Sequence, residues 1–300
     1  MLTLDRLRTL QAVAAHSSVS KAAVVLHLTP SAVSQHLRKL EQETGHQLVT
    51  RTGRGIRLTP TAELLVDRAR QILALVNETE AELQSFNDHP VGQLTLGAFP
   101  TAARGVIPGA LRILAERAPQ LKVIVRELDH ESPRTQVECG ELDVGIVQDW
   151  EHMPISWTAS VAKRLLMEDT ARVAMPADHP LAKSPVVHSS ELLGAPWISR
   201  SQRSTCHAWL MHTMREHGAE PRIAHMVSEH PTQLALVSAG VGLAMVPSLG
   251  LGQLAPGVVT RPVEPALTRR IYAVWQPEVV RPSVRAVVEA LAETAAGLPV

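Results

Sequence analysis

Apolar residues recur at helical spacing near the start of the chain and are interrupted by short polar turns. Leu4, Leu7, Leu10 and Val13 fall on one face of a helix that ends at a pair of serines. A second short helix over 20–26 carries two adjacent alanines, which let another helix pack closely against it. Two helices joined by a turn therefore open the chain.

A third helix follows, with clear signals at its start. Thr29 is a good N-cap, and Pro30 suits the first helical position. Val33, Leu37 and Leu40 recur at the spacing of an inner, apolar face. Three short helices with a shared core are predicted for this part of the chain.

The opposite face of the third helix carries the residue types that read duplex DNA. Ser31, Ser34, Gln35 and Arg38 lie on it, close to the start of the helix. Glutamine and arginine hydrogen-bond base edges in the major groove, while serine hydroxyls and helix N-termini bind phosphate. The pattern predicts the recognition helix of a helix-turn-helix.

Two short extended pieces follow over 47–59 and flank a pair of glycines, Gly53 and Gly55. Arg51, Arg54 and Arg57 are spaced along them. Arginines of a β-wing reach the sugar-phosphate backbone or the minor groove. Residues 1–58 are therefore expected to form an all-α winged helix-turn-helix DNA-binding domain.

The distribution of charge agrees with this interpretation. Residues 1–60 hold eight basic and three acidic side chains, a net charge of +5, within a chain whose formal net charge is zero. A basic end on a neutral chain is typical of a surface that binds phosphates. Taken alone, a charge of this size also fits an ordinary solvated face.

A long helix is predicted over 59–89, between the two halves of the chain. Leu65, Ala69, Ile72, Val76 and Leu83 follow alternating steps of four and three. This seam covers about three heptads, the short end of what supports a coiled coil. We expect a linker helix that dimerises, since a helix-turn-helix needs two half-sites for useful specificity; packing on its own chain is the alternative.

Strand and helix periodicity alternate from 92 to the C-terminus. Strands are expected at 93–97, 121–128, 143–147, 171–175, 196–199, 223–227, 242–247 and 270–275, and helices at 106–118, 135–139, 190–193, 205–217, 231–239 and 284–295. This alternation favours an α/β domain with a largely parallel sheet. We expect lobe I over 92–162 plus 268–300 and lobe II over 163–267, with a ligand cleft between them.

The N-terminal residues resemble the DNA-binding domain of the LysR-type transcriptional regulators. The resemblance rests on the alanine pair of the second helix, the Ser31-Ala-Val-Ser34 run, and the conserved-looking spacing of leucines and arginines up to Thr59. It implies that Pro30, Ser31, Ser34, Gln35 and Arg54 contact DNA. Pro30 stands where many members carry a base-reading glutamine, which changes the base preference.

The C-terminal half is similar to the LysR-type effector-binding domain, a fold like that of type 2 periplasmic solute-binding proteins. The similarity rests on short runs in a fixed order: Leu94-x-Leu96-Gly97, Ile107-Pro108, 140–146, 179–182 and 237–247. The resemblance implies a regulator that binds promoter DNA as a homodimer or homotetramer. It also implies a response to a small-molecule effector.

Candidate effector contacts are the polar residues at the starts of helices and in the loops after strands, where free N–H groups attract anions. The resemblance places the effector-binding Ser/Thr position of the family on Thr101. A carboxylate held by Thr101 and Arg200 is the expected ligand. The full set of candidates is Thr101, His130, Ser199, Arg200, Ser201, His230 and Thr232.

The sequence contains few motifs that would indicate another class of function. A glycine-rich phosphate loop, a Gly-x-Ser-x-Gly elbow and a His-Glu-x-x-His helix are missing from it, so we expect no enzyme, cofactor or metal. Cys139 and Cys206 are too few for a disulfide framework and far apart for a redox pair. The N-terminus lacks a signal-peptide pattern, and no segment has the roughly 20 apolar residues of a membrane span. We expect a cytoplasmic protein; the alternative is a cytoplasmic solute-binding protein whose N-terminal domain docks a partner.

Overall fold

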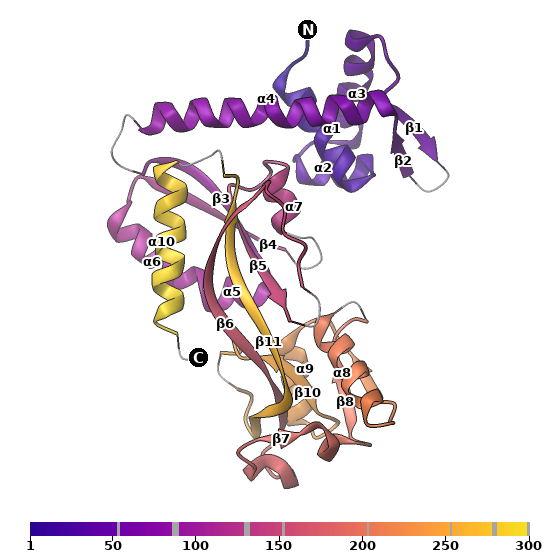
Figure 1. The fold of residues 1–300 in the computed structure, drawn as a ribbon, viewed down its shortest axis with the longest axis vertical. Helices are drawn as coiled ribbons and strands as arrows, with labels where there is room; N and C mark the ends of the chain where they lie inside the picture. Colours follow the sequence, from indigo (N-terminus) through magenta and orange to yellow (C-terminus); the bar gives the residue numbers. More distant parts are fainter. Residues whose placement is uncertain are drawn as a thin grey trace.

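The computed structural model describes residues 1–52, 55–85, 90–128, 133–151, 154–202, 204–252, 254–277 and 281–298. A small helical domain at the N-terminus is followed by one long helix and then by an elongated two-lobed domain (Figure 1). The long helix lies across the top of the elongated domain in this view. Among the described residues, no helix is long and apolar enough to cross a membrane.

The N-terminal domain contains three helices and a two-stranded hairpin, as the sequence predicts. Its elements are α1 (Leu4–His16), α2 (Val19–Val25), α3 (Pro30–Thr44), β1 (Val49–Thr52) and β2 (Gly55–Leu58). The Thr29 hydroxyl caps α3 by accepting a hydrogen bond from the Ala32 N–H at 3.1 Å. Helix α3 ends at Gly45, whose φ of 68° is the left-handed conformation that glycine adopts without strain.

The core of this domain is apolar and includes the start of the long helix α4 (Pro60–Ser85). Leu10, Val33 and Leu40 are fully buried at its centre. From α4, four residues at steps of four and three pack against it: Ala62, Val66, Ala69 and Leu73. The long helix therefore fixes the orientation of the DNA-binding domain through its own first half.

The predicted seam along α4 is correct in part. Ala69 is buried against the N-terminal domain, because it lies on the face that packs on α1. Ile72 and Leu83 are exposed, at 39% and 64%. Leu64 and Leu75, which the seam omits, are also exposed, at 60% and 61%. The apolar surface that α4 leaves uncovered therefore includes Ile72 and Leu83 of the predicted seam together with Leu64 and Leu75.

The elongated domain is organised by one curled sheet, in which the strand order is β10 (Ala244–Pro247), β6 (Ala162–Pro176), β11 (Val258–Trp275), β5 (Val144–Trp150), β3 (Gly92–Ala98) and β4 (Leu121–Glu127). Lobe I contains β3 (Gly92–Ala98), α5 (Pro100–Gly105), α6 (Ile107–Arg117), β4 (Leu121–Glu127), α7 (Pro133–Glu138), β5 (Val144–Trp150) and α10 (Pro282–Ala296). Helices α6 and α10 lie side by side in Figure 1, and their apolar residues share one core with β3 and β5. The expected single helix over 106–118 is preceded by a separate short helix, α5.

Lobe II holds the remaining elements around a second core. These are β7 (Val187–His188), β8 (Pro196–Ser199), α8 (Thr205–Glu216), β9 (Arg222–Met226), α9 (His230–Ser238) and β10 (Ala244–Pro247), with 3₁₀ turns at Pro180–Lys183 and Ser189–Leu192. The short helix expected at 190–193 is one of these turns. Trp197 and Trp209 are each 1% exposed and fill the centre of the lobe.

Two long strands connect the lobes, β6 (Ala162–Pro176) and β11 (Val258–Trp275). They pair with each other in antiparallel orientation along most of their length. The expectation of a largely parallel sheet is therefore wrong: β3 is parallel to β4 and β5, but the β5–β11, β11–β6 and β6–β10 pairs are antiparallel. The sheet is mixed because β11 runs back from lobe II to lobe I beside β6.

Candidate nucleic-acid interface and effector cleft

The outer face of α3 is open to a partner. Thr29, Pro30, Ser31, Gln35 and Arg38 are all exposed, at the start of the helix or along its polar side. Ser34 is half-buried, and its hydroxyl donates a hydrogen bond to the Pro30 carbonyl at 2.9 Å. Its oxygen still has capacity to accept a hydrogen bond. Six predicted DNA-binding residues therefore lie on one continuous surface.

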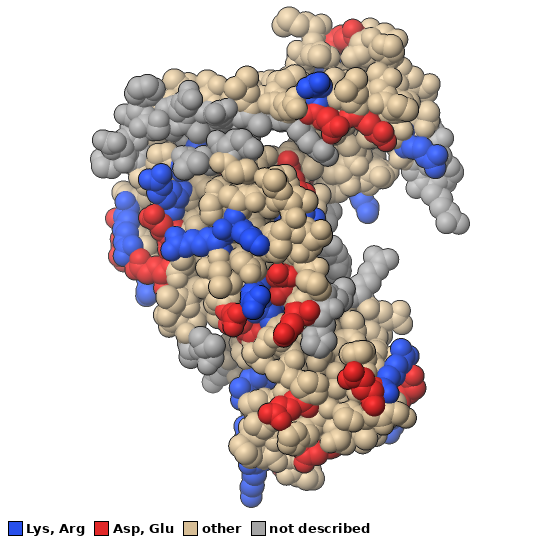
Figure 2. Space-filling view, in the orientation of Figure 1, with Lys and Arg blue, Asp and Glu red and all other residues tan. Residues whose placement is uncertain are grey.

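The wing is a two-stranded antiparallel hairpin in which Arg51 pairs with Ile56. The Ile56 N–H donates to the Ser17 carbonyl at 3.3 Å, which ties the wing to the end of α1. Arg57 is exposed on β2. The side chain of Arg51 and the whole of Arg54 lie outside the described residues. In Figure 2 the N-terminal domain overhangs an open space on the side of the wing.

A cleft of about 250 Å³ lies between the lobes, and four of the predicted effector residues line it. Thr101 comes from α5 in lobe I, Arg200 and Ser201 follow β8 in lobe II, and His230 opens α9. The other lining residues are Phe99, Pro100, Gln148, Trp150, Ser204, Thr205, Cys206, Pro247 and Arg269. Residues far apart in the sequence thus converge on one small, polar cavity.

Arg269 lines this cleft, although it is not among the candidates predicted from the sequence. Its side chain is almost fully buried, and its guanidinium donates to the Thr101 hydroxyl at 3.1 Å and to the Gln148 side-chain carbonyl. The guanidinium also lies 5.2 Å from the ring centre of Phe99 and 5.0 Å from that of Trp150. Arg269 therefore fixes the polar side chains of lobe I that face the ligand space.

Asp169 balances the charge of this arginine. Its carboxylate accepts from Arg269 Nε at 2.8 Å and lies 2.6 Å from Nη2, and both side chains are 2% exposed. Burial lowers the pKa of Arg269 from its ordinary value, and the Asp169 carboxylate opposes that shift. Asp169 therefore neutralises the charge of Arg269, and Arg200 is the second arginine that lines the cleft.

His230 is a neutral side chain in the cleft wall. Burial, followed by the charge of Arg200, lowers its pKa to about 3. The Gln233 amide nitrogen donates to the Ile198 carbonyl at 2.8 Å, so its oxygen faces His230 Nδ1, also at 2.8 Å. Nδ1 therefore carries the proton, and Nε2 is left as a hydrogen-bond acceptor.

The remaining effector candidates are placed differently. Ser199 is buried, and its hydroxyl lies 2.9 Å from His207 Nδ1, so it supports the wall of the lobe without lining the cleft. Thr232 is exposed one turn into α9 and is outside the lining. His130 lies outside the described residues. The cleft thus brings together four of the seven candidates.

Cys206 lines the cleft as a buried thiol. Burial raises its pKa to about 11, so the thiol is protonated near neutral pH and its nucleophilicity is low. Cys206 therefore packs as a small apolar residue in the core of lobe II. Within the described part of the chain, no group of three His, Cys, Asp or Glu side chains is arranged to hold a metal ion.

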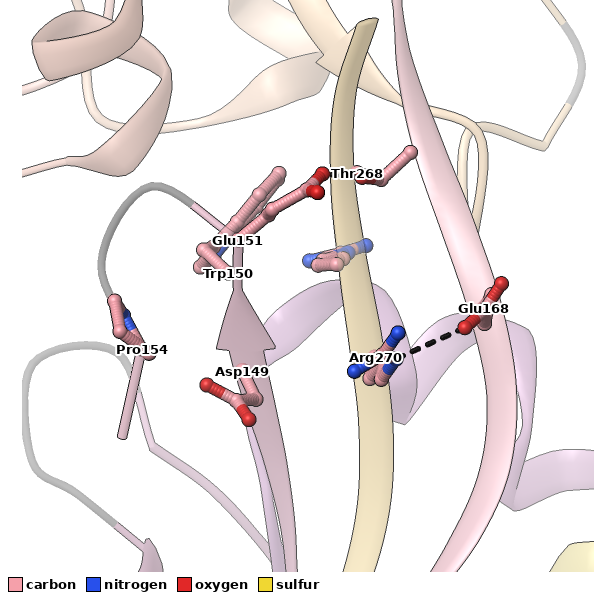
Figure 3. A pocket seen from close by; sticks show the side chains of 8 residues that line it. Asp149, Trp150, Glu151, Pro154, Glu168, Thr268 and Arg270 are labelled. Atoms are coloured by element: carbon pink, nitrogen blue, oxygen red, sulfur yellow. Dashed lines mark hydrogen bonds and ion pairs between the residues drawn. The ribbon is translucent and has the colours of Figure 1, made fainter. Parts of the chain in front are cut away.

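The opposite face of the connecting strands has a different, charged character. Asp149, Arg270 and Glu168 lie across β5, β11 and β6 and line a hollow of about 400 Å³ (Figure 3). Arg270 Nε donates to Glu168 at 2.9 Å, and Asp149 accepts from the Ile155 N–H at 2.7 Å. These carboxylates are therefore committed to contacts within the protein.

Comparisons with known proteins assign both halves of the chain. Residues 4–63 match the family model of the bacterial regulatory helix-turn-helix protein, lysR family, and residues 87–296 match the LysR substrate binding domain. The HTH-type transcriptional regulator XapR of Escherichia coli K12 is 27% identical over 290 residues, which is 97% of each chain. TtuA of Agrobacterium vitis, also an HTH-type transcriptional regulator, is 30% identical over 250 residues, 82% of this chain and 80% of that protein.

Solved structures share the whole fold. A cysteine variant of full-length OxyR from Pseudomonas aeruginosa has a TM-score of 0.70 at 23% identity and covers 98% of this chain and 95% of its own. CbnR, solved with its target DNA, has a TM-score of 0.55 at 20% identity and covers 98% of this chain and 100% of its own. At these identities the likeness concerns the fold.

The chain belongs to the LysR family of bacterial transcriptional regulators. It is a DNA-binding regulator with an effector-binding domain, and its class is not one of enzymes. As a member, it binds promoter DNA, responds to a small molecule and assembles with copies of itself. The alternative of a solute-binding protein finds no support among these relatives.

Proposed function

We propose that α3 reads the promoter in the major groove and that the wing holds the adjacent backbone. The observation that supports this is the exposed polar face of α3, whose start is capped by Thr29 and whose base-reading candidates are Gln35 and Arg38. Thr29, Pro30, Ser31 and Ser34 would contact phosphates or base edges near the helix start. Arg51 and Arg54 would bind sugar-phosphate from the wing.

The proposed effector is a small anion held in the cleft between the lobes. Arg200 supplies a guanidinium at the cleft wall, and the hydroxyls of Thr101 and Ser201 supply hydrogen bonds. A cleft of about 250 Å³ is slightly below the range of drug-sized sites, so it suits a compact metabolite. His230 Nε2 favours a ligand that also carries a hydroxyl or amide donor.

The effector would act by preferring one arrangement of the lobes. The lobes are connected by β6 and β11, which carry Asp169 and Arg269. A ligand that contacts both Thr101 in lobe I and Arg200 in lobe II would therefore stabilise the arrangement in which the two lobes lie close together. A ligand shifts such an equilibrium only by its difference in affinity for the two forms.

Self-association is proposed to use α4. Leu64, Leu75 and Leu83 are more than half exposed in the single chain, which is costly for a helix in water. The domain division that accompanies this proposal is 1–58, 59–89 and 92–300, with the lobes as expected from the sequence. We place the protein in the cytoplasm, where promoter DNA and metabolites meet.

The direct test is an electrophoretic mobility shift with DNA from upstream of the gene that encodes the chain. A retarded complex whose affinity falls with salt is expected. Failure to bind both that DNA and random duplex at low salt would contradict the assignment of α3. For the effector, thermal-shift measurements with small carboxylates should raise the melting temperature of the wild type and leave an Arg200→Gln variant unchanged.

A further inference from the structure

A second cavity, of about 720 Å³, lies beside β6 and shares no lining residue with the effector cleft. Its walls come from α5, β6, α9, the loop after β10 and Leu298, which follows α10. The volume is within the range of sites that take drug-sized ligands. It therefore has room for a ligand independent of the one in the cleft.

Much of this wall is apolar. Met167, Leu234, Leu249, Leu251 and Leu298 all contribute to it. Leu234 and Leu249 are each 5% exposed, so the interior of the cavity is well defined by packed side chains. Such a wall suits the hydrocarbon part of a ligand, because the transfer of apolar surface from water into an apolar site is favourable.

Two arginines give the cavity its charge. Arg104 is exposed, and its Nε donates to the Gly250 carbonyl at 3.3 Å, while Arg172 Nε donates to the Thr260 hydroxyl at 3.1 Å. No carboxylate of the described residues forms an ion pair with either of them. Burial, and then the positive charge of Arg261, lowers the pKa of Arg172, as expected for a guanidinium without a neutralising partner.

The carboxylates that line the cavity are already neutralised. Glu168 accepts from Arg270 at 2.9 Å, and Asp169 accepts from Arg269 at 2.8 Å. Paired charges of this kind add little net field to a neighbouring ligand. The two arginines therefore give the wall of the cavity a positive surplus, which favours an anionic ligand.

The cavity is also connected to the elements that hold the cleft. Helix α5 carries Thr101 in the cleft and Arg104 in the second cavity, and α9 carries His230 and Leu234 in the same way. Gly250 permits the close approach, because a Cβ there would lie 2.4 Å from the Thr101 carbonyl oxygen. A ligand in the second cavity would thus contact two helices, α5 and α9, that also carry residues of the cleft.

We propose that this cavity is a second ligand site, distinct from the effector cleft, that binds an apolar monocarboxylate. The carboxylate binds at Arg104 and Arg172, and a medium-length alkyl or aryl body packs against the leucines and Met167. The chemistry of recognition is a charge-assisted hydrogen bond to guanidinium combined with burial of hydrocarbon.

The test is calorimetric titration of the full-length chain with octanoate and, separately, with 1-octanol. Octanoate is expected to bind saturably and more tightly than the alcohol. The double substitution Arg104→Gln and Arg172→Gln should weaken octanoate binding about tenfold or more, since hydrogen bonds to charged groups are the stronger ones. Leu251→Trp, which fills the cavity, should abolish binding.

One control variant changes the charge elsewhere: Arg112→Gln alters an exposed arginine of α6 and should bind octanoate as the wild type does. Arg200→Gln, in the effector cleft, serves to locate the ligand. Equal affinity for octanoate and octanol would overturn the proposal. Binding that is lost with Arg200→Gln and kept by the cavity double variant would place the ligand in the cleft and equally overturn it.

Discussion

The recognition face of α3 and the effector cleft use similar polar side chains in opposite surroundings. On α3, Gln35 and Arg38 are exposed and project from a helix whose apolar face is buried in a separate core. In the cleft, the side chains of Arg269 and Asp169 are 2% exposed and bind each other. Arg269 also donates a hydrogen bond to the Thr101 hydroxyl. The DNA surface can therefore change with little effect on folding, whereas the cleft is part of what holds the lobes together.

The largest effect on stability is expected from a substitution that breaks the buried ion pair in the cleft. Arg269→Met leaves the Asp169 carboxylate buried without its counter-ion, which typically costs about 3–5 kcal/mol. All five tryptophans lie beyond residue 149, so urea unfolding followed by tryptophan fluorescence reports on the effector domain. The double variant Arg269→Met with Asp169→Leu should recover part of the loss. A single variant as stable as the wild type would show that the pair is not structural.

A second large effect concerns assembly. Leu75→Glu places a carboxylate on the exposed apolar face of α4, where Leu75 is 61% exposed in the single chain. Burial of one leucine contributes about 1.5–3 kcal/mol, so the variant should dissociate at concentrations where the wild type is oligomeric. Light scattering after size exclusion measures this. Glu63→Gln, at an exposed polar position of α4, is the matched control, and an unchanged mass for Leu75→Glu would count against this face.

A smaller effect should appear in the pH dependence of stability. The pKa of His230 is about 3 in the folded protein, below its ordinary value of 6.5, so the unfolded chain binds the extra proton between these values. Stability is therefore complete above pH 6.5 and falls toward pH 3, by up to about 1.4 kcal/mol per pH unit from this group.

His230→Gln should flatten that slope. The wild type and the variant share the other thirteen of the fourteen histidines. The difference between their stability curves against pH therefore reports on His230 alone. Urea unfolding at several pH values below 6.5 gives the comparison. Parallel curves for the two proteins would mean that His230 is not held neutral in the folded state.

The smallest expected effect lies where the two domains touch. His16 of α1 lies 3.7 Å from Glu141 of lobe I, and Arg126 lies 3.2 Å from His27 in the turn before α3. Glu141→Gln should increase hydrogen exchange in α1 and around residue 141 a few-fold, through local opening. Glu116→Gln, an exposed carboxylate on α6, should leave both regions unchanged. Identical exchange in the Glu141→Gln variant and the wild type would remove a role for this contact.

The sequence predicts helix α3 and its exposed polar face well because the signals there are local. The Thr29 cap, Pro30 and the spacing of Val33, Leu37 and Leu40 all lie within a dozen residues, and each describes the helix that contains it. The same surface on α3 is therefore identified before any tertiary contact is known.

The cleft is harder because its residues meet through non-local pairing. Arg269 belongs to a strand whose first part is interrupted by arginines and prolines, so the apolar pattern predicts only its end, 270–275. Its partner Asp169 is 100 residues away, and only the antiparallel β6–β11 register brings them together. The burial of Arg269 can be understood only once Asp169 is known to pair with it, and the sequence alone does not reveal that pairing.

The measurement that tests the account most directly compares Gln35→Ala and Arg54→Ala on the chain's own upstream DNA and on random duplex. Fluorescence anisotropy over a range of salt concentrations should show that Gln35→Ala loses about 1–3 kcal/mol on the specific site and little on random DNA. Arg54→Ala should weaken both DNAs and lower the salt dependence. If Gln35→Ala weakens the two DNAs equally, α3 is not the element that reads the promoter.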